Sequence, residues 1–339
     1  ITSVFLVRNP DYYLSGPYLE EISFAVYPNE SELLAAYRKK DIVSFFFFSR
    51  SAADTLERLN AHIQQFRMPK IFAVFLNANA APALNRRAVR EALARAIDRE
   101  ALLTGAPGGG MLVNSAIPPA SFGFTDDIEP LAYDADAARS LLAKDGWKDS
   151  DNDGVLERTE GSGTKRTTRK LEIRLVTSDA PELAADANRI AEMWRAIGVT
   201  VNVTTLPVGD LESTVIRPRS YDALLFGEVF GHDPDPFAFW HTSQLKDPGL
   251  NIALYSNRAV DQLLEEARRT NDPVKREEKY REFQKLVAKD IGAIFLYSPS
   301  QYYAIRPTVT AMVPAAITLP EERFDTINGW YSDTHRVLK

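Results

Sequence analysis

The stretch that decides the fold is Leu171–Thr204, which reads LEIRLVTSDAPELAADANRIAEMWRAIGVTVNVT. It opens on the alternating apolar residues of a strand, continues with a helical pattern over 181–197 and ends on a second strand over 199–204. Gly198 stands where a C-terminal helix cap belongs. A strand, a crossover helix and a second strand in this order predict a parallel pair within an α/β sheet.

The same alternation of strand and helix patterns continues on both sides of this unit. Upstream, a single amphipathic helix is predicted over 85–103, and the glycine-rich GAPGGG of 105–110 is interpreted as a mobile linker. Downstream, helices are predicted over 259–270 and 273–288, the second with Asn271-Asp272 as its cap. The chain is therefore expected to belong to the α/β class.

Length and composition restrict the function classes. At 339 residues the chain is too long for one ordinary core, so two lobes are expected. A net charge of −6 argues against nucleic acid as a partner, because that partner needs a basic face. Cysteine is absent, which excludes thiol catalysis, disulfides and cysteine-ligated zinc. The first residue is Ile1 rather than Met, and we expect any export signal to lie upstream.

The acidic stretch DSDNDGVLERTE, residues 149–160, matches the loop pattern of EF-hand calcium sites. The odd spacing of its oxygens suits a hard cation, and the glycine permits the sharp bend. The predicted ligands are the carboxylates of Asp149, Asp151, Asp153 and Glu160 and, at the fourth position, the backbone carbonyl of Val155. The alternative interpretation is an acidic hairpin turn, because Asp-Asn-Asp-Gly also favours tight turns. No cofactor is expected to be required, and a bound structural calcium would brace a hairpin.

A second unusual stretch, FGEVFGHDPDPFAFWHTSQ over 226–244, combines histidines, carboxylates and aromatic residues. Its two prolines stiffen the backbone so that neighbouring side chains diverge, which favours a rigid presentation loop over a metal cage. The aromatic residues are interpreted first as core beneath the loop, with an aromatic wall for a ligand as the alternative. Asp233 and Asp235 are alternatively interpreted as caps of a helix that begins near Pro236.

Several motifs together resemble the family-5 extracellular solute-binding proteins, the peptide, oligopeptide and nickel receptors of ABC importers. They are, in chain order, VRNPDYYLSGPYLEEISFAVYPNES, LNANAAPALNRRAVREALARAIDREALL, NSAIPPASFGFTDDIEPLAYDADAARSLLAKDGW, and GHDPDPFAFWHTSQ with the NIALYSN…IFLYSP segment that follows it. The resemblance implies a periplasmic-binding-protein-like α/β fold (type II, cluster C), with a large α/β lobe and part of a mixed α/β lobe joined by two hinge strands.

Mapped onto this chain, the resemblance makes 1–76 and 300–339 part of a discontinuous first domain. It makes 77–299 the third, ligand-binding domain, with the solute trapped between the two by hinge closure. Family members are longer at the N-terminus, so we expect this chain to be the C-terminal portion of such a receptor, without the second domain.

The resemblance also implies a function: a substrate-binding component that captures a peptide or another small solute and delivers it to ABC permease subunits, without catalysis. We expect a monomer at the periplasmic or extracellular face, peripheral or lipid-anchored in its full-length form. The ligand-binding residues are predicted to be Glu228, Phe230, Gly231, His232, Asp233 and Trp240. In peptide-binding relatives an aspartate pairs with the terminal ammonium of the peptide; the matching position here is Phe230, and Glu228 is the nearest carboxylate.

Two other classes remain as alternatives. One is a metal-dependent hydrolase that uses residues 149–160 or the histidine–aspartate loop, although no Gly-x-Ser-x-Gly or His-Glu-x-x-His motif occurs. The other is a calcium-stabilised interaction module without a small-molecule pocket. Elemental analysis with a hydrolase screen separates the first from a receptor, and a calcium-dependent melting temperature tests the second.

Overall fold

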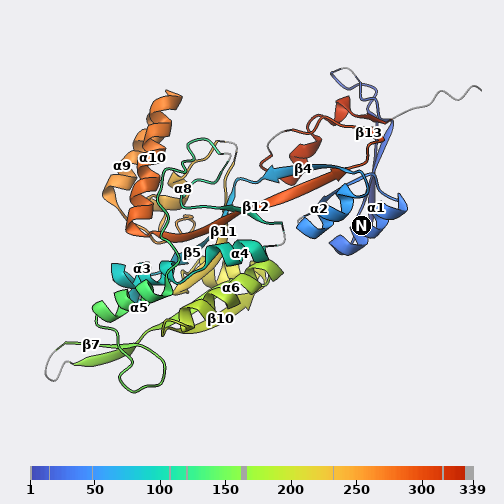
Figure 1. Ribbon diagram of the computed structural model, residues 1–339. Coiled ribbons are helices and arrows are strands. Elements are labelled where there is room, and N and C mark those ends of the chain that lie inside the picture. Colours follow the sequence, from blue (N-terminus) through green and yellow to red (C-terminus); the bar gives the residue numbers. More distant parts are fainter. Residues whose placement is uncertain are drawn as a thin grey trace, which may run out of the picture. The chain divides into compact units, whose positions relative to one another are not determined.

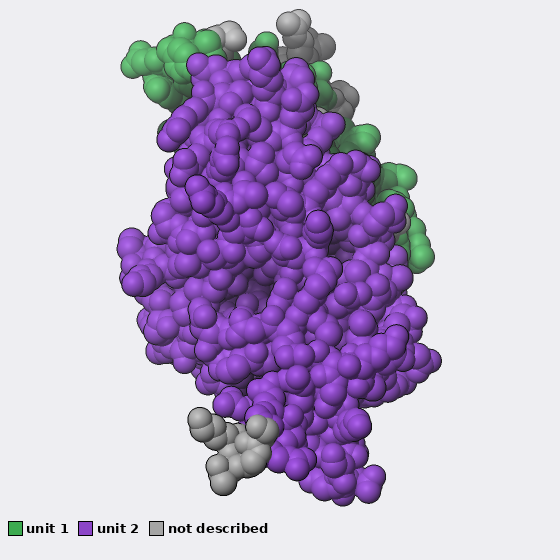
Figure 2. Space-filling view, turned by 90° about the vertical axis from the view of Figure 1, so that its left-hand side faces the viewer, with its two compact units in different colours: residues 1–68, 107–110, 299–339 green, residues 69–106, 111–298 purple. Residues whose placement is uncertain are grey.

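The computed structural model describes residues 2–14, 16–47, 49–106, 108–119, 121–161, 166–231, 233–314 and 317–332. The chain divides into two compact units, drawn in different colours in Figure 2. Unit 1 comprises 1–68, 107–110 and 299–339, and unit 2 comprises 69–106 and 111–298. Each unit has its own sheet and its own hydrophobic core.

The sheet of unit 2 contains the strand–helix–strand unit that the sequence predicts. Strand β9 (Glu172–Ser178) leads through helix α6 (Pro181–Arg195) to strand β10 (Thr200–Leu206), and β10 pairs with β9 in parallel. Gly198 follows α6 with a φ of 89°, and its N–H donates to the carbonyl of Arg195. The left-handed backbone that ends the helix explains the glycine at this position.

Three further strands complete this sheet. Strand β11 (Ala223–Val229) lies parallel to β9, β5 (Lys70–Leu76) lies antiparallel to β11, and the first half of β12 (Ala293–Ile305) lies antiparallel to β5. A separate antiparallel hairpin joins β7 (Glu157–Glu160) to β8 (Thr167–Lys170).

Helices cover both faces of the sheet in unit 2, as Figure 1 shows. On one face lie α3 (Arg87–Arg95), α4 (Arg99–Gly105), α5 (Ala135–Lys144) and α6. On the other lie α7 (Val208–Leu211), α8 (Phe237–Trp240), α9 (Arg258–Arg269) and α10 (Pro273–Asp290). Each helix buries its apolar stripe against the sheet, so unit 2 is a three-layer α/β/α structure. Asp272 caps α10, as predicted, by accepting from the backbone N–H groups of its first turn.

Unit 1 is built around the second half of β12. That segment pairs antiparallel with β3 (Ser44–Phe47) on one side and with β4 (His62–Arg67) on the other. Helices α1 (Glu30–Lys39) and α2 (Arg50–Glu57) pack on one face of this sheet, and the C-terminal segment packs on the other. The remaining strands form two small antiparallel pairs: β1 (Ser3–Val7) with β2 (Glu21–Ala25), and β13 (Val309–Thr310) with β14 (Tyr331–Ser332).

The prediction of a single helix over 85–103 is wrong, because the structure has two helices there, α3 and α4. Asp98 ends the continuity: its backbone is extended and its carboxylate accepts from the N–H of Ala101 as an N-cap. A side chain that bonds to the backbone in this way starts a new helix. Among the described residues, no helix is long and apolar enough to cross a bilayer.

The chain passes between the units at positions that differ from the predicted boundary at Leu76. Strand β5 pairs along its whole length with β11, so it lies in unit 2 and the boundary falls between Met68 and Pro69. The glycine-rich segment is a second passage between the units rather than a plain linker. Its described part is hydrogen-bonded to β12, with the carbonyls of Gly108 and Gly109 as acceptors, and Gly110 begins strand β6 (Gly110–Leu112).

A substitution at Gly198 tests the cap that ends α6. A Cβ there would lie 2.6 Å from Leu156 Cγ, and the backbone φ is one that L-residues rarely adopt. We expect Gly198→Ala to lower the free energy of unfolding by about 1–3 kcal/mol. The control is Gly209→Ala in α7, where a Cβ meets nothing within 4 Å. Chemical denaturation of both variants measures the difference, and equal stabilities would contradict the cap.

Candidate ligand-binding site

The carboxyl ends of three parallel strands lie at one edge of the unit 2 sheet. Strands β10, β9 and β11 run in the same direction, and β11 leads directly into the loop 230–236. The antiparallel β5 begins at this same edge, with Lys70 opposite Val229. In open α/β sheets, ligands bind outside the carboxyl ends of the strands. This edge is therefore the candidate site, and the predicted presentation loop lies on it.

Glu228, near the end of β11, points into the interior. It is 3% exposed and lies on the face of β11 that packs on the cluster around Trp240. Burial raises its pKa well above the ordinary value of a glutamate, and the nearby Trp240 indole, which lowers that pKa, only partly offsets the effect. Within the described part of the chain, neither Glu228 Oε1 nor Trp240 Nε1 makes a hydrogen bond of normal geometry. Burial thus favours the neutral form of this carboxyl, which lies below the loop rather than on its surface.

The aromatic residues of the stretch form the support of the loop. Trp240 is fully buried against Tyr255, Phe283 and Phe295. Phe230 is also buried: its ring lies 4.9 Å from that of Phe239, and its N–H donates to the carbonyl of Pro69. The interpretation of these residues as core fits their positions, and contact of Phe230 or Trp240 with a solute stays an untested prediction.

Two ion pairs hold the loop to the helices behind it. The Asp233 carboxylate accepts from both terminal nitrogens of Arg276 in α10, at 2.7 and 3.0 Å. The Asp235 carboxylate accepts from the guanidinium of Arg268 in α9. The capping interpretation of these aspartates is wrong, because α8 has Pro236 at its N-cap and no side-chain capping bond. Two prolines and two bidentate arginine contacts restrict the backbone of the described residues 233–236.

Among the described residues of the loop, the exposed part is small. The Gly231 backbone is exposed, and a Cβ there would meet nothing within 4 Å. The Asp233 side chain is exposed to solvent, although its carboxylate contacts Arg276. His232, the remaining predicted residue, lies outside the described residues. Of the six predicted ligand-binding residues, the structure thus brings all the described ones to one edge but exposes only Gly231 and Asp233.

Lys70 is a residue at this edge that the sequence analysis did not identify. Its ammonium lies 4.4 Å from the centroid of the Phe72 ring, and burial lowers its pKa. Among the described residues, no carboxylate lies within ion-pair distance of it, although Glu182 at the start of α6 raises its pKa through space. A lone lysine at the start of a strand carries no sequence signal, and only the antiparallel pairing with β11 places it at the site.

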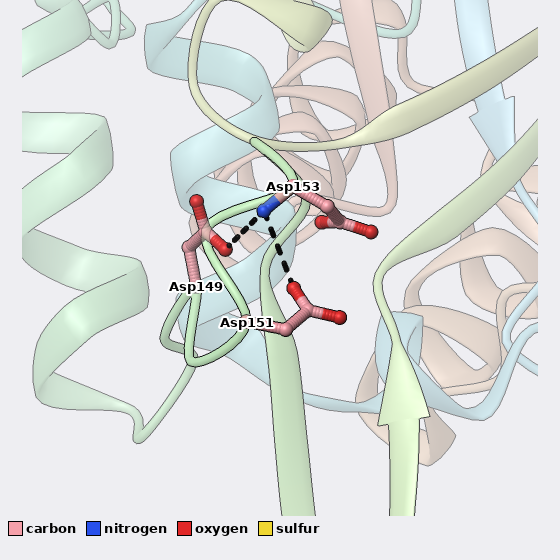
Figure 3. A group of neighbouring side chains, drawn as sticks. All are labelled: Asp149, Asp151 and Asp153. Atoms are coloured by element: carbon pink, nitrogen blue, oxygen red, sulfur yellow. Dashed lines mark hydrogen bonds between the residues drawn. The ribbon is translucent and has the colours of Figure 1, made fainter.

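The acidic loop 149–160 lies elsewhere in unit 2, and Figure 3 shows its three aspartates. Carboxylate oxygens of Asp149, Asp151 and Asp153 lie within 4.8 Å of one another. The Asp153 N–H donates to Asp149 and Asp151, and the Gly154 N–H donates to the other Asp149 oxygen. The carboxylates thus organise a turn, as in the hairpin interpretation.

The remaining predicted calcium ligands fit less well. Glu160 belongs to β7 rather than to the group of three, and its carboxylate contacts Arg158. The Lys170 ammonium contacts Asp153, lies 3.7 Å from Asp151, and lowers the pKa of Asp153. The loop leads into a strand instead of the second helix of an EF-hand. The structure therefore assembles only part of the predicted calcium ligands.

The sequence matches a known family over most of its length. The model of bacterial extracellular solute-binding proteins, family 5 (middle part), matches residues 2–250. The chain therefore belongs to this family of solute-binding proteins.

Individual relatives agree with this assignment. The oligopeptide-binding protein AppA of Bacillus subtilis is 27% identical over 306 residues, which are 88% of this chain and 54% of AppA. The nickel-binding periplasmic protein of Escherichia coli is 27% identical over 81% of this chain and 52% of its own length. The dipeptide-binding protein of Escherichia coli is 22% identical over 89% of this chain and 54% of its own length. The chain spans about half the length of these curated relatives.

Solved structures show the same fold. AppA of Bacillus subtilis, solved with a nonapeptide, has a TM-score of 0.78 at 24% identity and covers 98% of this chain and 64% of its own. NikZ of Campylobacter jejuni, solved with Ni(L-His), has a TM-score of 0.76 at 21% identity and covers 98% of this chain and 66% of its own. The predicted periplasmic-binding-protein-like α/β fold is thereby confirmed.

The buried carboxyl of Glu228 predicts a pH-dependent stability. Because the pKa of Glu228 is raised in the folded chain, the folded state holds a proton that the unfolded state releases. This contribution is full below the unfolded pKa and is lost as pH rises through the folded pKa. We expect Glu228→Gln to remove that loss, by about 1.4 kcal/mol per unit of pKa shift.

Denaturant unfolding between about pH 5 and pH 8 measures this difference, with Glu192→Gln on the exposed face of α6 as the matched control. Parallel stability curves for wild type and Glu228→Gln over this range would contradict a raised pKa of Glu228.

The calcium prediction is tested by melting temperature. If calcium binds the three aspartates, it stabilises the folded chain by RT ln(1 + [Ca²⁺]/Kd) and raises the melting temperature relative to a chelator. We expect Lys170→Ala to enlarge that rise, because the variant removes the cation now beside Asp151 and Asp153. Absence of any rise in both wild type and Lys170→Ala would show the prediction to be wrong.

Proposed function

We propose that the chain is the solute receptor of a bacterial ABC importer, which binds a peptide or another small solute and passes it unchanged to the permease. It works at the periplasmic or extracellular face of the cell envelope, as a monomer that is peripheral or lipid-anchored in its full-length form. The observation that supports this most directly is the placement of the described loop residues 230, 231 and 233–236: they lie at the carboxyl edge of the parallel strands and are held there by buried aromatic rings and two ion pairs.

A receptor needs such a rigid edge more than it needs reactive groups. A preorganised surface loses little conformational entropy when a solute binds, and it returns unchanged when the solute leaves. Gly231 offers an exposed backbone, Asp233 an exposed carboxylate and Lys70 an ammonium without a close acidic partner among the described residues. Groups of both charges beside exposed backbone suit a zwitterionic solute such as a peptide.

The described residues near the loop do not favour a hydrolase. His241 lies 2.8 Å from Ser243 Oγ, but its Nδ1 also accepts from the Ser243 backbone N–H and so caps a short 3-10 helix. Its ring stacks on Phe237 at 4.0 Å. A metal-dependent mechanism would need open coordination positions, whereas the aspartates of 149–160 are occupied by backbone N–H groups and Lys170. In the receptor proposal, His241 and the aspartates of 149–160 stabilise the local fold and take no part in a reaction.

Binding at the loop is tested with Gly231→Leu. A Cβ there would meet nothing within 4 Å among the described residues, and the backbone φ is not one that L-residues avoid. We therefore expect the fold to be retained, while the longer leucine side chain occupies the space in front of the loop. Wild type is first titrated by calorimetry with dipeptides, longer peptides and Ni²⁺–histidine. We expect at least one of these to bind, and Gly231→Leu to weaken that binding by about tenfold or more.

The matched control is Gly209→Leu, also at an open position, which should bind as wild type does. Equal affinities of wild type and Gly231→Leu would exclude the loop as the binding site. Turnover of any bound peptide by the purified chain would contradict a receptor without catalysis.

A further inference from the structure

Lys70 is the one charged residue of strand β5, and its side chain lies back along the sheet. Its Nζ lies 4.4 Å from the centroid of the Phe72 ring, two residues further along the strand. Because alternate residues of a strand share a face, Lys70 and Phe72 lie on the face that α6 covers. The Lys70 side chain is half-buried there, so its ammonium has a defined position at the carboxyl edge of the sheet.

Gly227 of β11 makes room for this side chain. It lies opposite Phe72 in the pairing of β11 with β5. A Cβ at Gly227 would lie 3.0 Å from Lys70 Cε and 3.1 Å from Phe72 Cε1. Contacts this short force neighbours to shift, so any larger residue at this position would displace the lysine stem or the ring. The glycine therefore allows the Lys70 ammonium to lie above Phe72.

The ammonium has no counter-ion among the described residues. Its pKa is lowered by burial and raised, to a smaller extent, by Glu182 in the first turn of α6, which acts only through space. The Phe72 ring supplies a cation–π contact but no acceptor oxygen, and Lys70 Nζ donates to no described group. A cation that is partly removed from water without a partner costs free energy. An anion that binds at this edge would offset that cost.

The carboxylates of the neighbouring loop already have partners or are buried. Asp233 and Asp235 each bind an arginine of the helices behind the loop. Glu228 is buried on the opposite face of β11. The exposed Asp179 follows the end of β9 and is not within ion-pair distance of Lys70. Beside the loop, Lys70 is thus a charge that the described residues leave for a solute.

The ammonium is close to the exposed part of the loop in the pairing register. Lys70 lies opposite Val229, the last residue of β11, and the next residue, Phe230, donates its N–H to the carbonyl of Pro69. The exposed backbone of Gly231 follows directly. An extended peptide covers about 3.3–3.6 Å for each residue. A solute of two or three residues that contacts Gly231 therefore reaches Lys70 as well.

We propose that Lys70 binds a carboxylate of the solute and so makes the receptor selective for solutes that carry a carboxylate. The C-terminal carboxylate of a peptide and the carboxylate of an acidic side chain share this chemistry. A solute without a carboxylate, such as a neutral sugar or a polyamine, leaves the ammonium unpaired. The inference rests on the proposed function, because it assigns the solute to the edge that carries the loop.

Calorimetry with matched peptides tests this role. Alanine peptides of increasing length are titrated as free acids and as C-terminal amides, and amidated peptides with one glutamate or one glutamine form a second pair. We expect wild type to bind the carboxylate-bearing member of at least one pair about tenfold or more tightly. If Ni²⁺–histidine is the probe that binds, histidine amide replaces histidine as the matched compound.

Variants of Lys70 separate its charge from its packing. Lys70→Met keeps an apolar stem over Phe72 but removes the charge, so we expect it to lose the preference for the carboxylate while its affinity for the neutral partner changes little. Lys70→Arg keeps the cation and should retain part of the preference. The matched control is Lys144→Met, at an exposed position in the last turn of α5, which should bind as wild type does.

Three outcomes overturn the inference. Equal affinity of wild type for the acid and the amide in both pairs would exclude a bound carboxylate and leave the receptor proposal intact. A loss in Lys70→Met that is equal for the acid and the amide would assign Lys70 a structural role only. Absence of binding by every peptide and by Ni²⁺–histidine would contradict the proposed function and the role of Lys70 together.

Discussion

The burial of strand β5 is the constraint on which unit 2 depends. Its residues from Ile71 to Leu76 are each at most 4% exposed, and alternate side chains enter the cores on the two faces of the sheet. At about 1.5–3 kcal/mol for each large apolar side chain, a shift of β5 by one residue would exchange its two faces and lose most of this stabilisation. The register of β5 is therefore fixed, and with it the positions of β11 and the first half of β12.

That register places the candidate site. Because Lys70 lies opposite Val229, β11 ends where β5 begins, and the loop 230–236 starts beside Pro69. The buried rings of Phe230 and Trp240 then support the loop from below, and Arg268 and Arg276 hold its carboxylates from behind. The stretch contains residues typical of reactive sites, yet most of them serve to fix its shape. A binding surface of this kind is preorganised and has few groups that change on binding.

The candidate site could be predicted from the sequence in part. The proline spacing of the loop predicts a rigid backbone, because the restriction on φ is local and needs no partner. The depth of each side chain is not local. Glutamate is a residue type that is usually exposed. Glu228 is nevertheless buried on the face of β11 that packs on the cluster around Trp240, since the alternation of β11 turns it towards the core. Asp235 resembles a helix cap but bonds to Arg268, a residue 33 positions away. The Asp235 carboxylate could bond either to the backbone of a nearby helix end or to the distant Arg268 guanidinium, and only the folded structure determines which of the two it contacts.

The order and type of the main elements were determined by the sequence alone. The strand–helix–strand pattern with Gly198, the cap at Asp272 and the apolar stripes of α9 and α10 all depend on neighbours within a few turns. Only the tertiary structure decided that β5 belongs to unit 2 and that Lys70 lies at the carboxyl edge of the sheet. Each of these depends on hydrogen bonds and apolar contacts between residues far apart in the chain, and a one-dimensional pattern does not record which distant edges meet.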